Sequence, residues 1–369
     1  MRVAVLGAAG IIAPAIVRDL ADAPGIDGLT LLDLDGDAAR AVAATHGGGI
    51  ATGAAVDAHD RQALTLAIEG HGLLLNAASY RVNLAAMDAA LAAGVNYVDL
   101  GGLYHVTLQQ LRLDAAFAAS GLVAILGCGA GPGKTNVMAA RAARELDVVH
   151  AIRCASAGHD ETPPPGLAVP YALQTLIDEL TEAPMTVRDG LPTPLEPLAA
   201  GGYIAFPEPI GDRPTIFTLH SEVATLPGTL GAAACDFRLA LAPTVEAALR
   251  EVVAAGTPVA DVPVVPSSPR TWSAQHVEVS GLRGGSPAVV TMTAVTQPHA
   301  EWGLGGGPVS TATVAAAVAR LLARGALGPV GGVLPVESAV TPELLFPELE
   351  ARGCTFSLRL DTTSEVHTP

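Results

Sequence analysis

The sequence is poor in aromatic residues and in lysine. Phe, Trp and Tyr make up 4% of the 369 residues while 50% are hydrophobic, so Ala, Val and Leu must build the cores. Lys134 is the only lysine, and the other permanent side-chain cations are all arginines. The formal net charge is −16, which argues against sequence-independent binding to nucleic acid or to an anionic membrane.

The sequence also lacks the motifs of disulfide frameworks, metal centres and membrane or secretory segments. The four cysteines have no C-x-x-C spacing, and His159-Asp160-Glu161 and His299-Ala300-Glu301 do not have the spacing of zinc motifs. No apolar run approaches the roughly 20 residues of a spanning helix. The chain enters a predicted strand directly, without the apolar core of a signal peptide. We therefore expect a cytoplasmic protein with reduced thiols and no metal.

The first twenty residues have the pattern of a dinucleotide-binding turn. The apolar run Val3–Leu6 predicts a buried strand, a Gly- and Ala-rich turn follows, and apolar residues then recur at helical spacing. The turn departs from G-x-G-x-x-G but fits G-x-x-G-x-x-A at Gly7, Gly10 and Ala13. An ordinary strand-to-helix turn is the alternative. The residues expected to contact the cofactor here are Gly7, Ala9, Gly10, Ile11 and Ile12.

An acidic residue follows at the distance expected for a ribose ligand. Asp33 ends a second predicted strand and can accept hydrogen bonds from both hydroxyls of an adenosine ribose. A 2′-phosphate would meet a like charge there, and Leu34 and Asp35 supply no cation to offset it. NAD is therefore favoured over NADP. A strand-end Asp in a plain turn is the alternative.

Strands and helices alternate through the first third of the chain. Apolar runs are separated by helical patterns, which predicts an α/β fold with a Rossmann-type, doubly wound parallel sheet. The predicted strands are 3–6, 28–33, 50–57, 72–78, 96–102 and 121–127. Asp57 ends the third predicted strand, and we expect it to lie beside the adenine of the cofactor.

The remainder predicts a second, mixed α+β domain. Separate β-like runs with Pro-rich connections between them occur at 151–155, 215–219, 275–279 and 288–295. A helical pattern returns at 313–324, and the segment 332–337 and a helix at 343–352 close the fold. We expect a dinucleotide-binding domain from 1–132 plus about 308–358, a substrate and oligomerisation domain at 133–307, and a flexible tail at 361–369.

The loop at 127–135 allows two interpretations. It nearly matches the phosphate-binding G-x-x-x-x-G-K-T motif, in which Lys134 would reach phosphates and Thr135 would hold magnesium. However, Cys128 occupies the first glycine position, and a nucleotide site is already predicted at Gly7. Lys134 could instead bind a substrate carboxylate or act as an acid or base, or it could be a solvated loop residue.

Several segments together resemble the saccharopine dehydrogenase superfamily, especially its saccharopine reductase and lysine 6-dehydrogenase branch. The resemblance spans nearly the whole chain. It is carried by Gly7–Ala13, Asn76–Tyr80, Ala93–Asp99, Gly131–Gly133 with Asn136, His220–Pro227 and Gly332–Glu337 with Arg352-Gly353.

The resemblance implies a nicotinamide-dependent oxidoreductase that acts on a C–N bond of an amino acid. It implies that the C-terminal helices fold back onto the nucleotide domain. It also places a set of residues along a cleft near the nicotinamide: Ala77, Ala78, Ser79, Tyr80, Asp99, Gly131 and Pro132. Saccharopine reductases carry an Asp where this chain has Gly131, which weakens the case for saccharopine as the substrate.

Three further positions are candidates for catalysis. His220 and Glu222 are two residues apart in a strand-like run, so we expect them on one face, where the carboxylate would raise the imidazole pKa and fix its tautomer for general-base work. A surface pair is the alternative. Tyr80 can donate to a substrate nitrogen or carboxylate, or only pack against the cofactor.

These observations favour an NAD-dependent amine dehydrogenase similar to lysine 6-dehydrogenase, acting as a homodimer or larger homo-oligomer. His220 or Lys134 would take a proton from the amine before hydride transfer. A saccharopine dehydrogenase is the second interpretation. A non-catalytic dinucleotide-binding protein is the third.

Overall fold

The computed structural model describes residues 1–362 and divides into two compact units. The first unit comprises Met1–Gly133, His299–Leu304 and Pro308–Arg352. The second comprises Lys134–Pro298, Gly305–Gly307 and the described residues from Gly353 onward.

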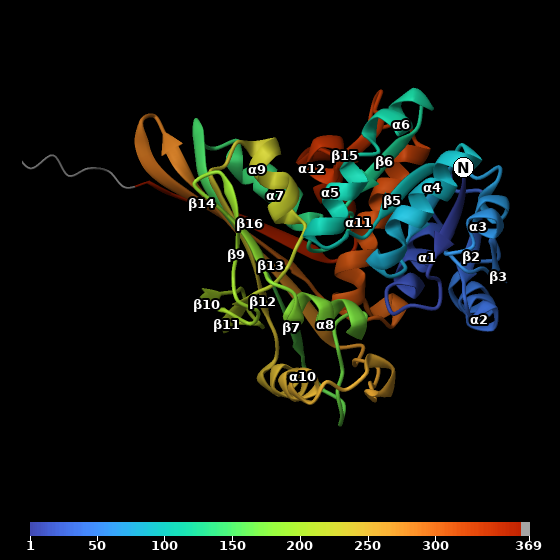
Figure 1. Ribbon diagram of the computed structural model, residues 1–369, viewed down its shortest axis with the longest axis horizontal. Helices are drawn as coiled ribbons and strands as arrows, with labels where there is room; N and C mark the ends of the chain where they lie inside the picture. The colour runs from blue at the N-terminus through green and yellow to red at the C-terminus, as the bar shows by residue number, and fades with distance from the viewer. Residues whose placement is uncertain (363–369) are drawn as a thin grey trace, which may run out of the picture. The chain divides into compact units, whose positions relative to one another are not determined.

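The first unit contains a seven-stranded parallel sheet. Its strand order is β15-β6-β5-β4-β1-β2-β3 (Figure 1). The chain adds β2 and β3 on one side of β1 and then continues with β4 on its other side, as in doubly wound folds. The strands are β1 (Arg2–Leu6), β2 (Gly28–Asp33), β3 (Ala51–Ala55), β4 (Leu73–Asn76), β5 (Asn96–Asp99), β6 (Val123–Leu126) and β15 (Gly332–Pro335). The predicted fold class is confirmed.

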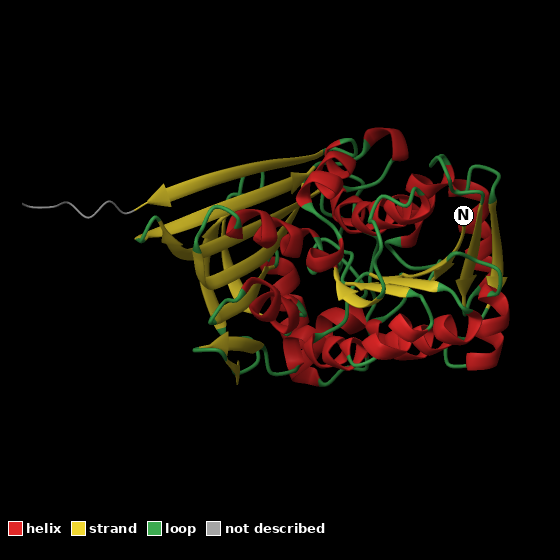
Figure 2. Cartoon of the chain, turned by 90° about the horizontal axis from the view of Figure 1, so that it is seen from above, coloured by secondary structure: helices red, strands yellow, loops and turns green. Residues whose placement is uncertain are grey.

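Helices cover both faces of this sheet (Figure 2). They are α1 (Ala13–Ala21), α2 (Gly36–His46), α3 (Arg61–Ile68), α4 (Asn83–Ala93), α5 (Tyr104–Leu111), α6 (Asp114–Ala119), α11 (Gly306–Ala323), α12 (Val336–Ala339) and α13 (Pro342–Glu350), with short 3₁₀ turns at Tyr80–Val82 and Ala300–Trp302. Because both faces are covered, β1 and β4 are continuous apolar runs whose residues from Val3 to Leu6 and from Leu73 to Leu75 are buried.

Helix α11 has the length and composition of a membrane-spanning segment. It is the one such helix among residues 1–362, whereas the sequence led us to expect none. In the structure 72% of it is buried, as in the core helix of a globular domain.

The second unit contains a nine-stranded mixed sheet. Strand β12 runs parallel to β7, and the other neighbours are antiparallel. The strands are β7 (Val148–Asp160), β8 (Met185–Arg188), β9 (Leu191–Pro194), β10 (Ala200–Ala205), β11 (Asp212–Phe217), β12 (Ala234–Ala240), β13 (Thr271–Arg283), β14 (Ser286–Thr296) and β16 (Cys354–Thr362). The helices are α7 (Lys134–Ala143), α8 (Leu173–Thr181), α9 (Glu222–Leu230) and α10 (Pro243–Ala255), with a 3₁₀ turn at Val259–Asp261.

The expected boundaries near the C-terminus are wrong. The nucleotide-binding part ends at Arg352, not near residue 358, because β16 pairs with β14 from Thr296↔Cys354 to Ala288↔Thr362. The tail that we expected from Asp361 overlaps this strand, and residues 363–369 lie outside the described part of the chain. Apolar residues alternate with polar ones along β16, which is the signal of a half-buried strand.

A buried ionic cluster joins α1, α11 and α13 within the first unit. Asp19, which is 5% exposed, lies 2.7 Å from Arg320 and 2.9 Å from Arg352. Glu348 also contacts Arg320, at 2.9 Å. These ion pairs fix α11 and α13 to α1.

We predict that Asp19→Asn lowers the free energy of unfolding by about 3 kcal/mol or more, because it leaves two arginines with an incomplete partner in a desolvated site. Urea denaturation followed by circular dichroism measures the loss. Asp22→Asn is the control: its side chain is 74% exposed and 3.6 Å from Arg18, so we expect a change below about 0.5 kcal/mol. Equal stabilities of the two variants would contradict the assigned role.

Candidate functional site

The turn between β1 and α1 begins with small residues, which lets the loop after β4 approach it closely. Gly7 has φ +81°, and a Cβ there would overlap the backbone of Ala77 and Ala78, which follow β4. Ala9 and Gly10 are exposed at the start of α1, which no described side chain caps. A helix N-terminus of this kind offers backbone N–H groups to a pyrophosphate.

The carboxylate of Asp33 is held beside this turn. Its Oδ2 accepts a hydrogen bond from Ala9 N–H at 2.9 Å, and its Oδ1 accepts one from Asp35 N–H at 3.1 Å. The neighbouring Leu34 is 73% exposed and carries no charge. These residues fit the adenosine ribose of a dinucleotide. Asp57 lies exposed after β3 and accepts a bond from His59 N–H, so its contact with adenine stays a prediction.

Asp99 supports the loops at the carboxyl edge of the parallel sheet. It is 1% exposed, and its Oδ1 accepts bonds from Gly101 N–H at 3.0 Å and Gly127 N–H at 2.8 Å. Its Oδ2 accepts bonds from Gln110 at 2.6 Å and Asn83 at 3.2 Å. Burial raises the pKa of Asp99, although these hydrogen bonds oppose the rise. The geometry gives Asp99 a positioning role in place of the ligand contact that we expected.

A second set of polar side chains shapes the loop after β4. Asn76 accepts a bond from Ala78 N–H at 3.0 Å and donates to Asn83 at 2.9 Å and to Tyr97 at 3.1 Å. Our sequence interpretation missed Asn83 and Gln110, since a single Asn or Gln in a helical pattern gives no signal of burial. Ser79 begins the short turn that contains Tyr80, which is half-buried.

The first N–H groups of the loop at 127–133 are engaged within the first unit. Gly127 N–H donates to the carboxylate of Asp99, Cys128 N–H to the carbonyl of Asp99, and Gly129 N–H to the carbonyl of Pro132. Pro132, which follows a cis peptide bond from Gly131, packs where a Cβ on Gly101 would be. A phosphate bound at the start of this loop would have to displace these bonds, which argues against the phosphate-binding interpretation.

Lys134 is buried rather than solvated. It is 0% exposed at the start of α7, and its Nζ donates to Thr296 Oγ1 at 2.9 Å. Burial lowers its pKa, and the neighbouring Cys354 raises it in part. The hydroxyl of Thr135 donates to Glu222 at 2.7 Å, so it is engaged with a carboxylate and not placed for magnesium. The interpretation of Lys134 as a solvated loop lysine is wrong.

His220 and Glu222 form the expected pair by a different geometry. They do not lie on a strand, because α9 begins at Glu222 and Ser221 already has helical angles. Nδ1 of His220 is 2.5 Å from Oε2 of Glu222. The two residues are 6% and 0% exposed, so the alternative of a surface pair is excluded.

Two residues that the sequence did not single out complete this buried cluster in the second unit. Glu179 of α8 is 3.8 Å from Nε2 of His220 and accepts a bond from the hydroxyl of Tyr171 at 2.5 Å. The predicted site residues thus fall into two groups, one within each unit. The first unit holds the dinucleotide turn and the loops around Asp99, and the second holds Lys134 and the His220 cluster.

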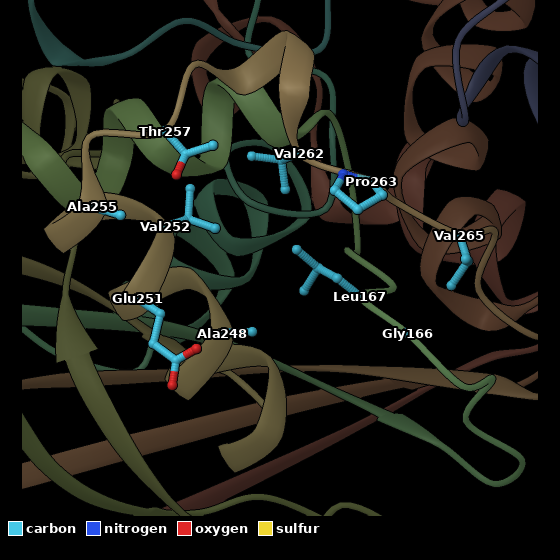
Figure 3. A pocket seen from close by; sticks show the side chains of 10 residues that line it. All are labelled: Gly166, Leu167, Ala248, Glu251, Val252, Ala255, Thr257, Val262, Pro263 and Val265. Atoms are coloured by element: carbon cyan, nitrogen blue, oxygen red, sulfur yellow. The ribbon is translucent and has the colours of Figure 1, made fainter.

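A separate apolar depression of about 470 Å³ lies on the second unit beside α10 (Figure 3). It is lined by Gly166, Leu167, Ala248, Glu251, Val252, Ala255, Thr257, Val262, Pro263 and Val265. None of the predicted site residues contributes to it, and Glu251 is its one charged side chain. Among residues 1–362 no group of three His, Cys, Asp or Glu side chains is arranged to hold a metal ion.

The fold and the dinucleotide turn define a nucleotide-binding α/β protein with a second unit built on a mixed sheet. Residues 3–125 match the family model described as the saccharopine dehydrogenase NADP binding domain. The match covers about a third of the chain and confirms the resemblance to saccharopine dehydrogenases that the sequence indicated. The match supports a nicotinamide dinucleotide as the cofactor.

Part of the chain is similar to a curated protein of known activity. Carboxyaminopropylagmatine dehydrogenase of Synechocystis is 31% identical over 168 residues, which are 42% of this chain and 41% of that protein. The matched region thus spans about two fifths of the relative's length.

Apo saccharopine dehydrogenase (L-Glu forming) of Saccharomyces cerevisiae has a TM-score of 0.71 at 13% identity, covering 98% of this chain and 100% of that one. Homospermidine synthase of Legionella pneumophila, in complex with NAD, has a TM-score of 0.76 at 12% identity, covering 100% and 93%. At these identities the likeness shows a shared fold.

We predict that Gly7→Ala lowers the free energy of unfolding more than Gly49→Ala does, because the new Cβ at residue 7 would force the loop at Ala77–Ala78 away from the turn. The expected loss of unfolding free energy exceeds that of the control by about 1–3 kcal/mol, the range for overpacking. Gly49→Ala is the matched control: its φ is +84° against +81° for Gly7, and a Cβ there would meet no atom within 4 Å. Thermal or urea unfolding compares them, and equal losses would show that only the backbone angle matters.

Proposed function

We propose that the protein is an NAD-dependent oxidoreductase acting on a C–N bond of an amino acid or of an amine derived from one. The observation that carries the proposal is a buried imidazole between two carboxylates, in a chain whose first unit is a dinucleotide-binding domain. Such a cluster can accept a proton from an amine, which this reaction requires.

The preference for NAD rests on Asp33. Its carboxylate beside the Ala9 turn suits the two hydroxyls of an unphosphorylated ribose, and the adjacent positions 34 and 35 offer no positive charge. The matched family is named for NADP, and one structural relative was solved with NAD, so this preference is our inference from the side chain.

The residues of the chain divide the chemical work. A nicotinamide dinucleotide held by the turn at Gly7 and by Asp33 would supply the hydride acceptor for the carbon that carries the nitrogen. The amine must first lose its proton, and we assign that step to Nε2 of His220, because Glu222 holds the other ring nitrogen. Lys134, with its lowered pKa, is the alternative base. Tyr80 is the candidate donor to the substrate, and water then hydrolyses the substrate imine.

The leading substrate class is an amino acid with a primary amine, such as lysine oxidised at its side-chain nitrogen. The loop at Gly131 lacks the acid expected of saccharopine reductases. A second candidate is a secondary amine. It is favoured by the curated relative, whose name describes an agmatine carrying a carboxyaminopropyl group.

The direct test incubates the purified protein with NAD and, separately, L-lysine, saccharopine and carboxyaminopropylagmatine, and follows NADH absorbance. Turnover of lysine supports the leading class. Turnover of only the two secondary amines supports the second candidate and overturns the first. If none of these amines and no other amino acid reduces NAD, the oxidoreductase proposal is wrong, and a non-catalytic dinucleotide-binding protein remains.

We predict that NAD binds at least tenfold more tightly than NADP, because a 2′-phosphate beside Asp33 would meet a like charge in a partly desolvated turn. Asp33→Ala should reduce this ratio. Asp37→Ala is the control, since its side chain is 94% exposed and paired with Arg40 on α2. Titration by intrinsic or NADH fluorescence gives the affinities, and equal or tighter binding of NADP to the unaltered protein would contradict the assignment.

A further inference from the structure

We propose that Glu179, through its negative charge, sets the pH at which His220 can take a proton from the substrate amine. The inference deepens the oxidoreductase function proposed above and rests on it. Glu179 acts through His220, so it is a positioning residue and not a member of the group that contacts substrate.

Glu179 is placed by α8 in an enclosed position opposite the histidine. Its side chain is 4% exposed, and its Oε1 lies 3.8 Å from Nε2 of His220. This separation is too long for a hydrogen bond but short for a charge interaction. The other oxygen, Oε2, accepts the hydroxyl hydrogen of Tyr171 at 2.5 Å, which fixes the carboxylate in this orientation.

The opposite nitrogen of the imidazole is already committed. Glu222 is 2.5 Å from Nδ1 through its Oε2 and accepts the Thr135 hydroxyl at 2.7 Å through its Oε1. Glu222 accepts a hydrogen bond from Thr135, as an ionised carboxylate does, so the Nδ1 that faces it carries a proton. The nitrogen that gains and loses a proton is therefore Nε2. That nitrogen faces Glu179.

The ring plane is fixed by an aromatic neighbour. Phe237 of β12 stacks on His220 with ring centroids 3.6 Å apart and an interplanar angle of 7°. The imidazole therefore cannot turn Nε2 away from Glu179 without losing this contact and the bond to Glu222.

The charges around the pair couple the two titrations. Burial lowers the pKa of His220, but Glu222, by charge and hydrogen bond, and Glu179, by charge, raise it above its ordinary value. Burial raises the pKa of Glu179 to about 7, while His220 and the Tyr171 bond lower it and Glu222 and Asp178 raise it. Two ionisable groups this close titrate as a coupled pair, so a change of charge on one shifts the pKa of the other.

The consequence for the reaction has a definite sign. While Glu179 is ionised it stabilises the imidazolium, so His220 can accept the amine proton only after releasing its own at higher pH. Glu179→Gln removes that charge, so the pKa of His220 should fall. The acid limb of kcat/KM should then move to lower pH by about one unit or more, as expected for loss of an opposite charge within about 4–6 Å.

The test combines two readouts on the full-length protein. NMR titration of the His220 ring resonances reports its pKa without any turnover, and the pH profile of kcat/KM with NAD and the amine that is turned over reports the catalytic base. Glu182→Gln, at the exposed end of the same helix, is the matched control and should change neither.

Tyr171→Phe is the second variant, available if Glu179→Gln does not fold. Loss of the phenol hydrogen bond raises the pKa of Glu179, so His220 should again titrate lower, by less than in Glu179→Gln. An unchanged His220 titration in whichever variants fold overturns the charge coupling between Glu179 and His220. A shifted titration with an unmoved kcat/KM profile shows that another base acts, which overturns the catalytic part. If the His220 titration shifts but the protein turns over no amine, the oxidoreductase function on which the inference rests is wrong.

Discussion

A continuous set of hydrogen bonds from Asp99 shapes the edge of the parallel sheet where the cofactor is expected. The carboxylate of Asp99 binds the loops at Gly101 and Gly127 and the side chain of Asn83. Asn83 in turn binds Asn76, which holds the backbone of Ala78. That backbone lies where a Cβ on Gly7 would be, so the geometry of the dinucleotide turn depends on these buried polar groups.

The second unit uses a carboxylate in a comparable way. Glu222 joins Thr135 of α7 to His220, and the neighbouring Asn136 donates to Thr225 of α9. Two helices that lie far apart in the sequence are thereby held in one arrangement beside the sheet (Figure 1). The imidazole is consequently fixed by groups from several elements, which is the preorganisation that proton transfer in a buried site requires.

The sequence correctly predicts the structure of segments whose conformation depends on the local pattern of residues. The strand at Val3–Leu6, the glycine turn and the strand ending at Asp33 follow from runs of residues whose spacing is fixed by secondary structure, and the parallel sheet was predicted from their alternation with helices. The likeness of several short motifs to one family was also sufficient to identify the first domain.

Sequence reasoning failed where tertiary contacts override local pattern. His220–Glu222 looked like a strand, but Glu222 is needed at the start of a helix, where it accepts the Thr135 hydroxyl. The sequence left open whether Lys134 is solvated or functional, because Thr296, the partner of its buried ammonium, lies 162 residues later. Glu179 was missed because nothing within α8 distinguishes a carboxylate that a distant histidine will face.

The central claim is that the carbon bearing the substrate's nitrogen gives its hydride to the nicotinamide. The most direct measurement uses lysine deuterated at its side-chain carbon next to nitrogen, together with saccharopine deuterated at the carbons next to its secondary nitrogen, and locates the label in the reduced cofactor by NMR. The account predicts deuterium at C4 of the nicotinamide ring with one of the two amines. Reduced cofactor without deuterium, or no reduction by any amine, would contradict it.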